Sequence, residues 1–216
     1  MRVRKSFERK EGVRNPRLIV VAAEGRKTEK IYIEALSEAY RAPGVHVEML
    51  EREENASSPD KVLAQIKTYQ EKYDTTAEYD ELWVVVDRDR WGDKKLFAVA
   101  NACAQDSLHF CLSNPCFELW LLLHLEDVAN YSEEDKAALA KNERKPKKTG
   151  NTWLKKKMKK VMGQYSEAKY DTNKLLPHIY TAIERAIQLD ENPQDMWPKT
   201  TGTRVYLLAQ SIMGAR

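Results

Sequence analysis

The sequence predicts an α/β protein with a parallel four-stranded sheet flanked by helices and followed by a helical C-terminal extension. Strand patterns alternate with helix patterns over residues 17–125, which is the order that parallel α/β sheets require. After Asp127 the sequence is polar and helical in pattern, without another strand of comparable quality. The 216 residues suit one domain or one core with an appendage, and 42% hydrophobic residues exclude a disordered chain.

The first half of this pattern consists of a strand, a helix, a second strand and a second helix. Residues 17–23 form a short apolar, β-branched run, which indicates a buried strand. A helix follows, with Thr28 as its expected N-cap, and the alternating residues 45–50 form the second strand. Ser58 caps the next helix and places Pro59 at its first position.

The second half repeats the alternation. Residues 82–86 are the clearest buried strand, residues 94–104 are expected to be helical, and residues 108–112 form the fourth strand. A strongly apolar helix follows over residues 114–125, with Pro115 in its first turn.

Charge is distributed unevenly along the chain. We divide the chain into a basic N-terminal arm at 1–16, a catalytic core at 17–126 and a basic helical region at 127–216 that packs on the core. Residues 141–160 contain ten Lys or Arg and one acid, Glu143, although the whole chain has a net charge of only +3. Such a block either contacts nucleic-acid phosphates or forms a solvated surface.

Several classes of protein are excluded or disfavoured. No apolar run approaches the roughly 18 residues of a membrane-spanning helix, and residues 1–12 lack the apolar stretch of a secretory signal. Cys103, Cys111 and Cys116 form no C-x-x-C pair, which excludes a zinc ribbon. We therefore expect a cytoplasmic protein without a membrane partner.

Acidic side chains follow two predicted strands at the points where these strands end. Glu24 ends the first strand, and Asp87 and Asp89 end the third. Ligands bind beyond the carboxyl ends of parallel strands, and residues i and i+2 of an extended chain face the same side. A lone D-x-D is usually a turn or a helix cap, but the second acidic strand end favours a metal site. Carboxylate ligands of this kind favour Mg²⁺ or Mn²⁺.

The helix after the fourth strand offers further candidates. Free N–H groups at its start attract phosphate, and Ser113 and Asn114 can cap the helix or contact that anion. Glu118 lies about one turn further on. Three roles for Glu118 follow from this position: a fourth metal ligand, a partner that orients an active-site group, or a residue that only interacts with the helix dipole.

Two groups of basic residues are candidates for substrate binding. Arg26 and Lys27 follow the Glu24–Gly25 turn, where they either hold a scissile phosphate or are ordinary turn residues. Thr152 is the expected N-cap of an amphipathic helix, and residues 146–150 before it are expected to act as a hinge. The lysines that we expect to project outward from this helix toward nucleic acid are Lys155, Lys156, Lys159 and Lys160.

Several motifs resemble those of a known family. The segments IVVAAEG at 19–25 and LWVVVDRD at 82–89 resemble a Toprim domain. The segments LSNPCFELWLLLHL at 112–125 and TGTRVYLLAQ at 201–210 resemble the RloB family of bacterial defence-associated Toprim proteins. This resemblance covers most of the chain. It implies a Toprim-like fold, in which Glu24 acts as acid/base and the D-x-D acids bind metal during phosphodiester chemistry.

The leading hypothesis is a magnesium- or manganese-dependent nuclease that acts in antiphage defence on RNA or DNA. The cation would generate hydroxide, and Glu24 would move the proton. The resemblance also implies an ATPase partner. The chain has no P-loop of its own, so any ATP dependence must come from another protein. The alternatives are a non-catalytic nucleic-acid-binding partner of a defence ATPase and a small-molecule phosphohydrolase.

Overall fold

The computed structural model describes residues 17–52, 57–73, 75, 79–146 and 150–215, and it confirms the predicted α/β class. Its sheet has the strand order β2-β1-β3-β4-β5, in which the first four strands are parallel and β5 is antiparallel to β4. This arrangement is compatible with a Toprim-like fold. The strands are β1 (Arg17–Ala23), β2 (Val45–Met49), β3 (Glu81–Asp87), β4 (His109–Asn114) and β5 (Gly202–Thr203).

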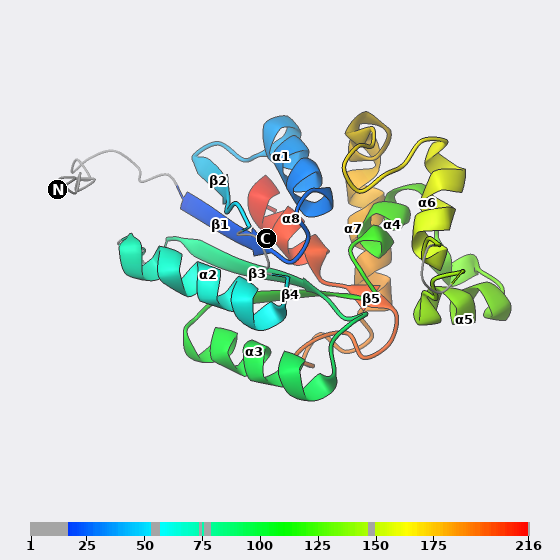
Figure 1. The fold of residues 1–216 in the computed structure, drawn as a ribbon. Helices are drawn as coiled ribbons and strands as arrows, with labels where there is room; N and C mark the ends of the chain where they lie inside the picture. The colour runs from blue at the N-terminus through cyan, green and yellow to red at the C-terminus, as the bar shows by residue number, and fades with distance from the viewer. Residues whose placement is uncertain (1–16, 53–56, 74, 76–78, 147–149, 216) are drawn as a thin grey trace.

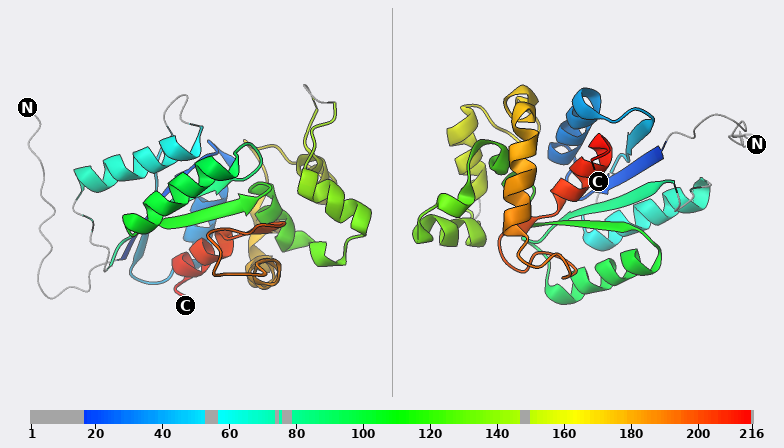
Figure 2. Two further views of the ribbon diagram at one scale, coloured as in Figure 1. Left: turned by 90° about the horizontal axis from the view of Figure 1, so that it is seen from below. Right: turned by 180° about the vertical axis from the view of Figure 1, so that it is seen from behind.

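Helices cover both faces of the sheet and extend beyond one of its ends. Figure 1 shows α2 and α3 on one face and α1 and α8 on the other, with α4 to α7 grouped beyond the carboxyl ends of the strands. Figure 2 shows the same grouping from below and from behind. The helices are α1 (Thr28–Tyr40), α2 (Pro59–Lys72), α3 (Asp93–Gln105), α4 (Glu118–Leu125), α5 (Glu133–Lys141), α6 (Trp153–Met162), α7 (Ile179–Leu189) and α8 (Val205–Met213).

The alternation of side chains along each strand explains why the strand sequences are apolar throughout. In β1, Ile19 and Val21 belong to the core that includes α1 and α8, whereas Val20 and Ala22 belong to the core that includes α2 and α3. All four side chains are fully buried. A parallel sheet that is covered on both faces requires such a continuous apolar run.

The core on the α1 face continues into the C-terminal half of the chain. It unites Trp120 of α4 with Met158 of α6, Ile183 of α7 and Leu208 of α8. The predicted division after residue 126 therefore separates segments that share one apolar core, and it stays a prediction. The predicted basic arm at 1–16 lies outside the described residues. Within the described ranges, no helix is long and apolar enough to cross a membrane.

Two predicted helix starts are wrong. Lys27 occupies the N-cap position of α1, while Thr28 is the first helical residue and its Oγ1 donates to the Glu167 carbonyl at 3.2 Å. Helix α4 begins at Glu118, so Pro115 precedes it. The Pro115 carbonyl instead accepts the N–H groups of Arg88 and Asp89, at 3.1 and 3.0 Å, which ties this segment to the end of β3.

Other predicted boundaries are confirmed. Ser58 precedes α2 and Pro59 is its first residue. The hydroxyl of Thr152 accepts the N–H of Lys155 at 3.4 Å and caps α6 as predicted. The prediction did not include β5, because a two-residue strand carries no readable periodicity.

Candidate functional site

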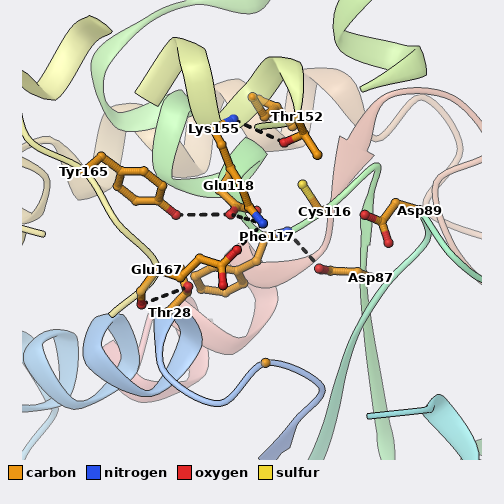
Figure 3. Close-up of polar contacts among 12 residues, drawn as sticks. Thr28, Asp87, Asp89, Cys116, Phe117, Glu118, Thr152, Lys155, Tyr165 and Glu167 are labelled. Atoms are coloured by element: carbon orange, nitrogen blue, oxygen red, sulfur yellow. Dashed lines mark hydrogen bonds and ion pairs between the residues drawn. The ribbon is translucent and has the colours of Figure 1, made fainter. Parts of the chain in front are cut away.

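A cleft of about 640 Å³ opens at the carboxyl ends of β1 and β3. The four predicted metal-binding acids, Glu24, Asp87, Asp89 and Glu118, all line it, and we call it the acidic cleft. Figure 3 shows the two aspartates at one side and Glu118 with Lys155 at the other. The sheet and α4 therefore bring together acids that are up to 94 residues apart in the sequence.

Glu24 follows β1 directly and is held by residues of the adjacent strand β3 and of the loop after it. Its N–H donates to the Val85 carbonyl at 2.9 Å, and the Asp87 N–H donates to its Oε2 at 3.3 Å. The Trp91 Nε1–H lies 3.0 Å from both carboxylate oxygens. Burial raises the pKa of Glu24, although the bonds from Trp91 and Asp87 oppose this rise. The result is an oriented carboxyl group with an increased tendency to keep its proton.

The two aspartates lie in a crowded negative environment. Asp87 Oδ1 accepts the Phe117 N–H at 2.9 Å, just before the start of α4. Burial, and then the charges of Glu29 and Glu118, raise the pKa of Asp87 well above its usual value. Partial burial also raises the pKa of Asp89, although Arg90, with Nε 3.8 Å from Asp89 Oδ1, opposes the rise. A bound cation would relieve this repulsion.

Glu29 is a buried acid of the cleft that the sequence reasoning missed. The Gly25 N–H donates to Glu29 Oε1 at 3.1 Å, and among the described residues Oε2 has no hydrogen-bond partner. A Cβ at position 25 would overlap the Glu29 carboxylate, so a larger residue there would displace this group. Burial raises the pKa of Glu29 to about 7. The sequence carried one signal for Glu29, its distance from Gly25. A residue four positions after this glycine lies in the first turn of the following helix, α1.

Only one of the four predicted α6 lysines lines the cleft. Lys155 pairs with Glu167 and lies 3.9 Å from Glu118 Oε1, and its side chain is only 19% exposed. The prediction that Lys155 projects outward is wrong, because it shares a helix face with the buried Met158 and Met162.

The other three lysines are exposed and do not line the cleft. Lys156 Nζ donates to the Lys145 carbonyl at 2.7 Å, whereas Lys159 and Lys160 follow in the last turn of α6. Their prediction as nucleic-acid contacts outside the cleft stays a prediction. Of the predicted hinge at 146–150, residues 147–149 lie outside the described residues.

Exposed cations surround the acids, as predicted for two of them. Arg26 and Lys27 line the cleft beside Glu24, and Arg90 and Arg144 line it as well. Arg88, between the two aspartates, instead pairs with Asp93 at 2.7 Å. The arrangement places positive side chains at the opening of a cleft with a negative interior.

Ser113 and Asn114 do not line the acidic cleft, and their predicted contact with an anion stays a prediction. The hydroxyls of Ser113 and Thr203 lie 2.7 Å apart. Asn114 Nδ2 donates to the carbonyls of residues 198–200, the shortest bond being 2.7 Å to Thr200. Both side chains therefore hold β5 and the loop before it, and Asp87 takes the N–H group expected to attract phosphate.

A hard divalent cation in this cleft would have only a small number of protein ligands. Among the described residues, no three His, Cys, Asp or Glu side chains form a group that could hold a metal ion. Mg²⁺ is often bound through one or two carboxylates, with waters and substrate phosphates completing its shell. Asp87 and Asp89 provide such carboxylates, and the mutual repulsion of the acids favours a positive ion.

The fold and this site define a class: an α/β protein with an acidic cleft at the carboxyl ends of a parallel sheet. Comparison with protein families then identifies the chain more closely. The RloB-like protein family matches residues 19–212, and the chain belongs to this family, as its motifs predicted. No curated protein and no solved structure matches the chain significantly.

Proposed function

We propose that the protein is a metal-dependent nuclease that hydrolyses phosphodiester bonds in the acidic cleft. The observation that carries this proposal is the meeting of Glu24, Asp87 and Asp89 in one cleft at the ends of adjacent strands. Acids at the carboxyl ends of parallel strands lie where such sheets bind ligands. The cations at the opening of the cleft suit a phosphate-bearing substrate.

Each acid has a distinct task in this proposal. Asp87 and Asp89 hold the cation, which supplies Lewis-acid polarisation of the phosphate and a lowered pKa of bound water. Glu24 donates a proton to the leaving oxygen, a role that its raised pKa favours. Trp91 and the Asp87 N–H keep the Glu24 carboxyl group in one orientation.

The positive side chains favour a nucleic acid over a small phosphorylated molecule. Arg26, Lys27, Arg90 and Arg144 are exposed around the opening of the cleft, and the exposed lysines of α6 continue this charge beyond it. A polyanion can contact all of these residues at once, whereas a single phosphate cannot. Whether the backbone is RNA or DNA is decided by the experiment below.

A cleavage assay tests the proposal directly. Purified protein is incubated with labelled RNA, labelled DNA and p-nitrophenyl phosphate, in Mg²⁺, Mn²⁺ or EDTA. We expect metal-dependent cleavage of a nucleic acid that Asp87→Asn and Asp89→Asn abolish. Glu71→Gln is the matched control, because Glu71 is an exposed acid of α2 outside the cleft.

Other outcomes contradict the proposal in distinguishable ways. Turnover of p-nitrophenyl phosphate alone would indicate a small-molecule phosphohydrolase. Metal-independent binding of nucleic acid without any cleavage would indicate a non-catalytic binding protein. Calorimetry with Mg²⁺ or Mn²⁺ adds a separate check, because unchanged affinity in both aspartate variants would overturn the metal assignment.

The cellular role is part of the same proposal. Resemblance to defence-associated proteins supports a function against phage and an ATPase encoded nearby as a partner. Plaque assays with the wild-type protein, Asp87→Asn and Glu71→Gln would test the first point. Co-purification with the neighbouring ATPase would test the second. Protection that persists in Asp87→Asn would separate defence from cleavage.

A further inference from the structure

Lys155 and Glu167 form an ion pair inside the acidic cleft. The two side chains of this pair differ in their exposure to solvent. The Lys155 side chain is 19% exposed, whereas that of Glu167 is 57% exposed. Figure 3 shows the Lys155 ammonium group pointing between Glu118 and Glu167. The pair therefore joins a shielded cation to an anion that solvent already reaches.

Lys155 is fixed by the start of α6. Thr152 caps the helix by accepting the Lys155 N–H, and Asn142 Oδ1 accepts the Leu154 N–H at 3.0 Å. Leu154 and Met158 are fully buried on either side of Lys155 in the sequence. Burial alone would lower the pKa of Lys155, but Glu167 and Glu118 outweigh it and raise that pKa. The cleft thus keeps a permanently charged ammonium group.

The position of Glu167 is fixed by backbone hydrogen bonds, whereas its side chain forms the ion pair with Lys155. It lies in a tight turn in which Ser166 and Lys169 exchange backbone hydrogen bonds of 3.0 and 2.9 Å. The Thr28 hydroxyl donates to the Glu167 carbonyl oxygen. Because these backbone bonds do not involve the carboxylate, that group can leave Lys155 without breaking the turn.

We propose that Lys155 binds a backbone phosphate of the nucleic acid, and that the Glu167 carboxylate occupies this subsite until the phosphate replaces it. The inference rests on the proposed function, because it takes a phosphodiester as the ligand. Carboxylate and phosphate oxygens accept the same charged N–H donors, so one can replace the other. Asp87 and Asp89 line the same cleft, so a phosphate on Lys155 lies in the cavity that contains the proposed cation ligands.

A double-mutant cycle in binding tests this exchange. A short fluorescein-labelled single-stranded RNA is titrated in EDTA with the wild type, Glu167→Gln, Lys155→Gln and the double variant. Glu167→Gln should tighten binding about threefold or more by vacating the subsite. Lys155→Gln should weaken binding and reduce the salt slope by about 0.7, the value for one single-strand phosphate contact. In the Lys155→Gln background, the Glu167 substitution should bring no further gain.

The matched control is the second ion pair of the same helix. Lys157 lies 2.8 Å from Glu126, is 20% exposed, and neither residue lines the acidic cleft. The corresponding cycle with Lys157→Gln and Glu126→Gln should show no coupling in RNA binding. Lys155→Arg keeps the charge and should keep the salt slope, which provides a second variant if Lys155→Gln melts early.

Failure of this inference differs from failure of the proposed function. Equal gains from Glu167→Gln with and without Lys155 would show that Glu167 acts only through net charge, and would overturn the inference. So would coupling of the same size in the control pair, or wild-type protein that binds neither this RNA nor single-stranded DNA of the same sequence. Coupled binding without metal-dependent cleavage would overturn the nuclease proposal alone.

Discussion

The two walls of the acidic cleft are positioned by different physical means. On the strand wall, Glu24 follows β1 and Asp87 is the last residue of β3, and the pairing of Ala23 with Val85 fixes their separation through backbone hydrogen bonds. On the helix wall, Lys155 and Glu167 depend on the packing of α6 and on the turn after it. Sheet register determines the first arrangement locally, whereas tertiary packing determines the second. We therefore expect substitutions on the strand wall to affect chemistry and those on the helix wall to affect binding.

The largest expected effect is on the strand wall. Glu24→Gln removes the proposed proton donor and should lower the cleavage rate about 100-fold or more, the usual scale for a general acid or base. Nucleic-acid binding should stay nearly unchanged, because the amide keeps the shape of the side chain. Single-turnover cleavage and fluorescence anisotropy measure the two quantities. Wild-type turnover in this variant would assign Glu24 a structural role only.

The second effect concerns stability and pH on the same wall. The pKa of Glu29 is about 7 in the folded protein against an ordinary 4.5, so the folded state binds this proton more tightly. The stabilisation is complete below about pH 4.5 and is lost as the pH rises through about 7. Above this range the ionised Glu29 therefore destabilises the folded state relative to its protonated form.

Glu29→Gln should therefore raise the free energy of unfolding at about pH 8 and flatten its decline between about pH 4.5 and 7. Chemical denaturation at several pH values measures both. Mg²⁺ should stabilise the wild type more at the higher pH, because a cation competes with protons for the acids. Glu71→Gln, on the exposed surface of α2, should leave the pH dependence unaltered. A decline of the same slope in Glu29→Gln would contradict the assignment.

A third substitution tests how the walls are joined. Asn142 Nδ2 donates to Cys116 Sγ at 3.3 Å and its Oδ1 accepts the Leu154 N–H, so it links the segment before α4 to α6. Asn142→Gly should cost about 1–3 kcal/mol by leaving a buried N–H without a partner. Glycine tolerates the left-handed backbone of this residue, which has φ 43°. Asn142→Ala should lower the free energy of unfolding further, because alanine is strained in this left-handed conformation. Equal losses of stability in the two variants would show that this strain is negligible.

The smallest effect per residue belongs to the exposed face of α6. Replacement of Lys156, Lys159 and Lys160 by Gln should reduce the salt slope of nucleic-acid binding by about two to three units, about 0.7 to 0.9 for each lost phosphate contact. Cleavage at saturating substrate and metal binding should be unaffected, because these side chains do not line the cleft. An unaltered salt slope would show that this face is only solvated, or that it binds an acidic protein partner.

The strand wall could be predicted from the sequence, and much of the helix wall could not. The apolar runs at residues 17–23 and 82–86 end in acids, and parallel strands bring their carboxyl ends together without further information. By contrast, Lys155 and Lys156 are indistinguishable in composition, and only the packing of Met158 against the core decides which one enters the cleft. The hydrogen bond of Ser113 could not be predicted, because its partner Thr203 lies 90 residues further on.

Helix α4 has a consequence for how this protein can be inherited. Leu119 to Leu123 are completely buried, so this helix is enclosed on all sides. Such a helix requires cover from every direction, which the residues before it and those of α6, α7 and α8 provide jointly. Recombination between two family members near residue 126 would join two halves whose apolar surfaces had evolved in different proteins. These surfaces would not be matched to one another around α4. We therefore expect the two halves to pass through evolution as one unit, with substitutions in α4 and α7 occurring in compensating pairs.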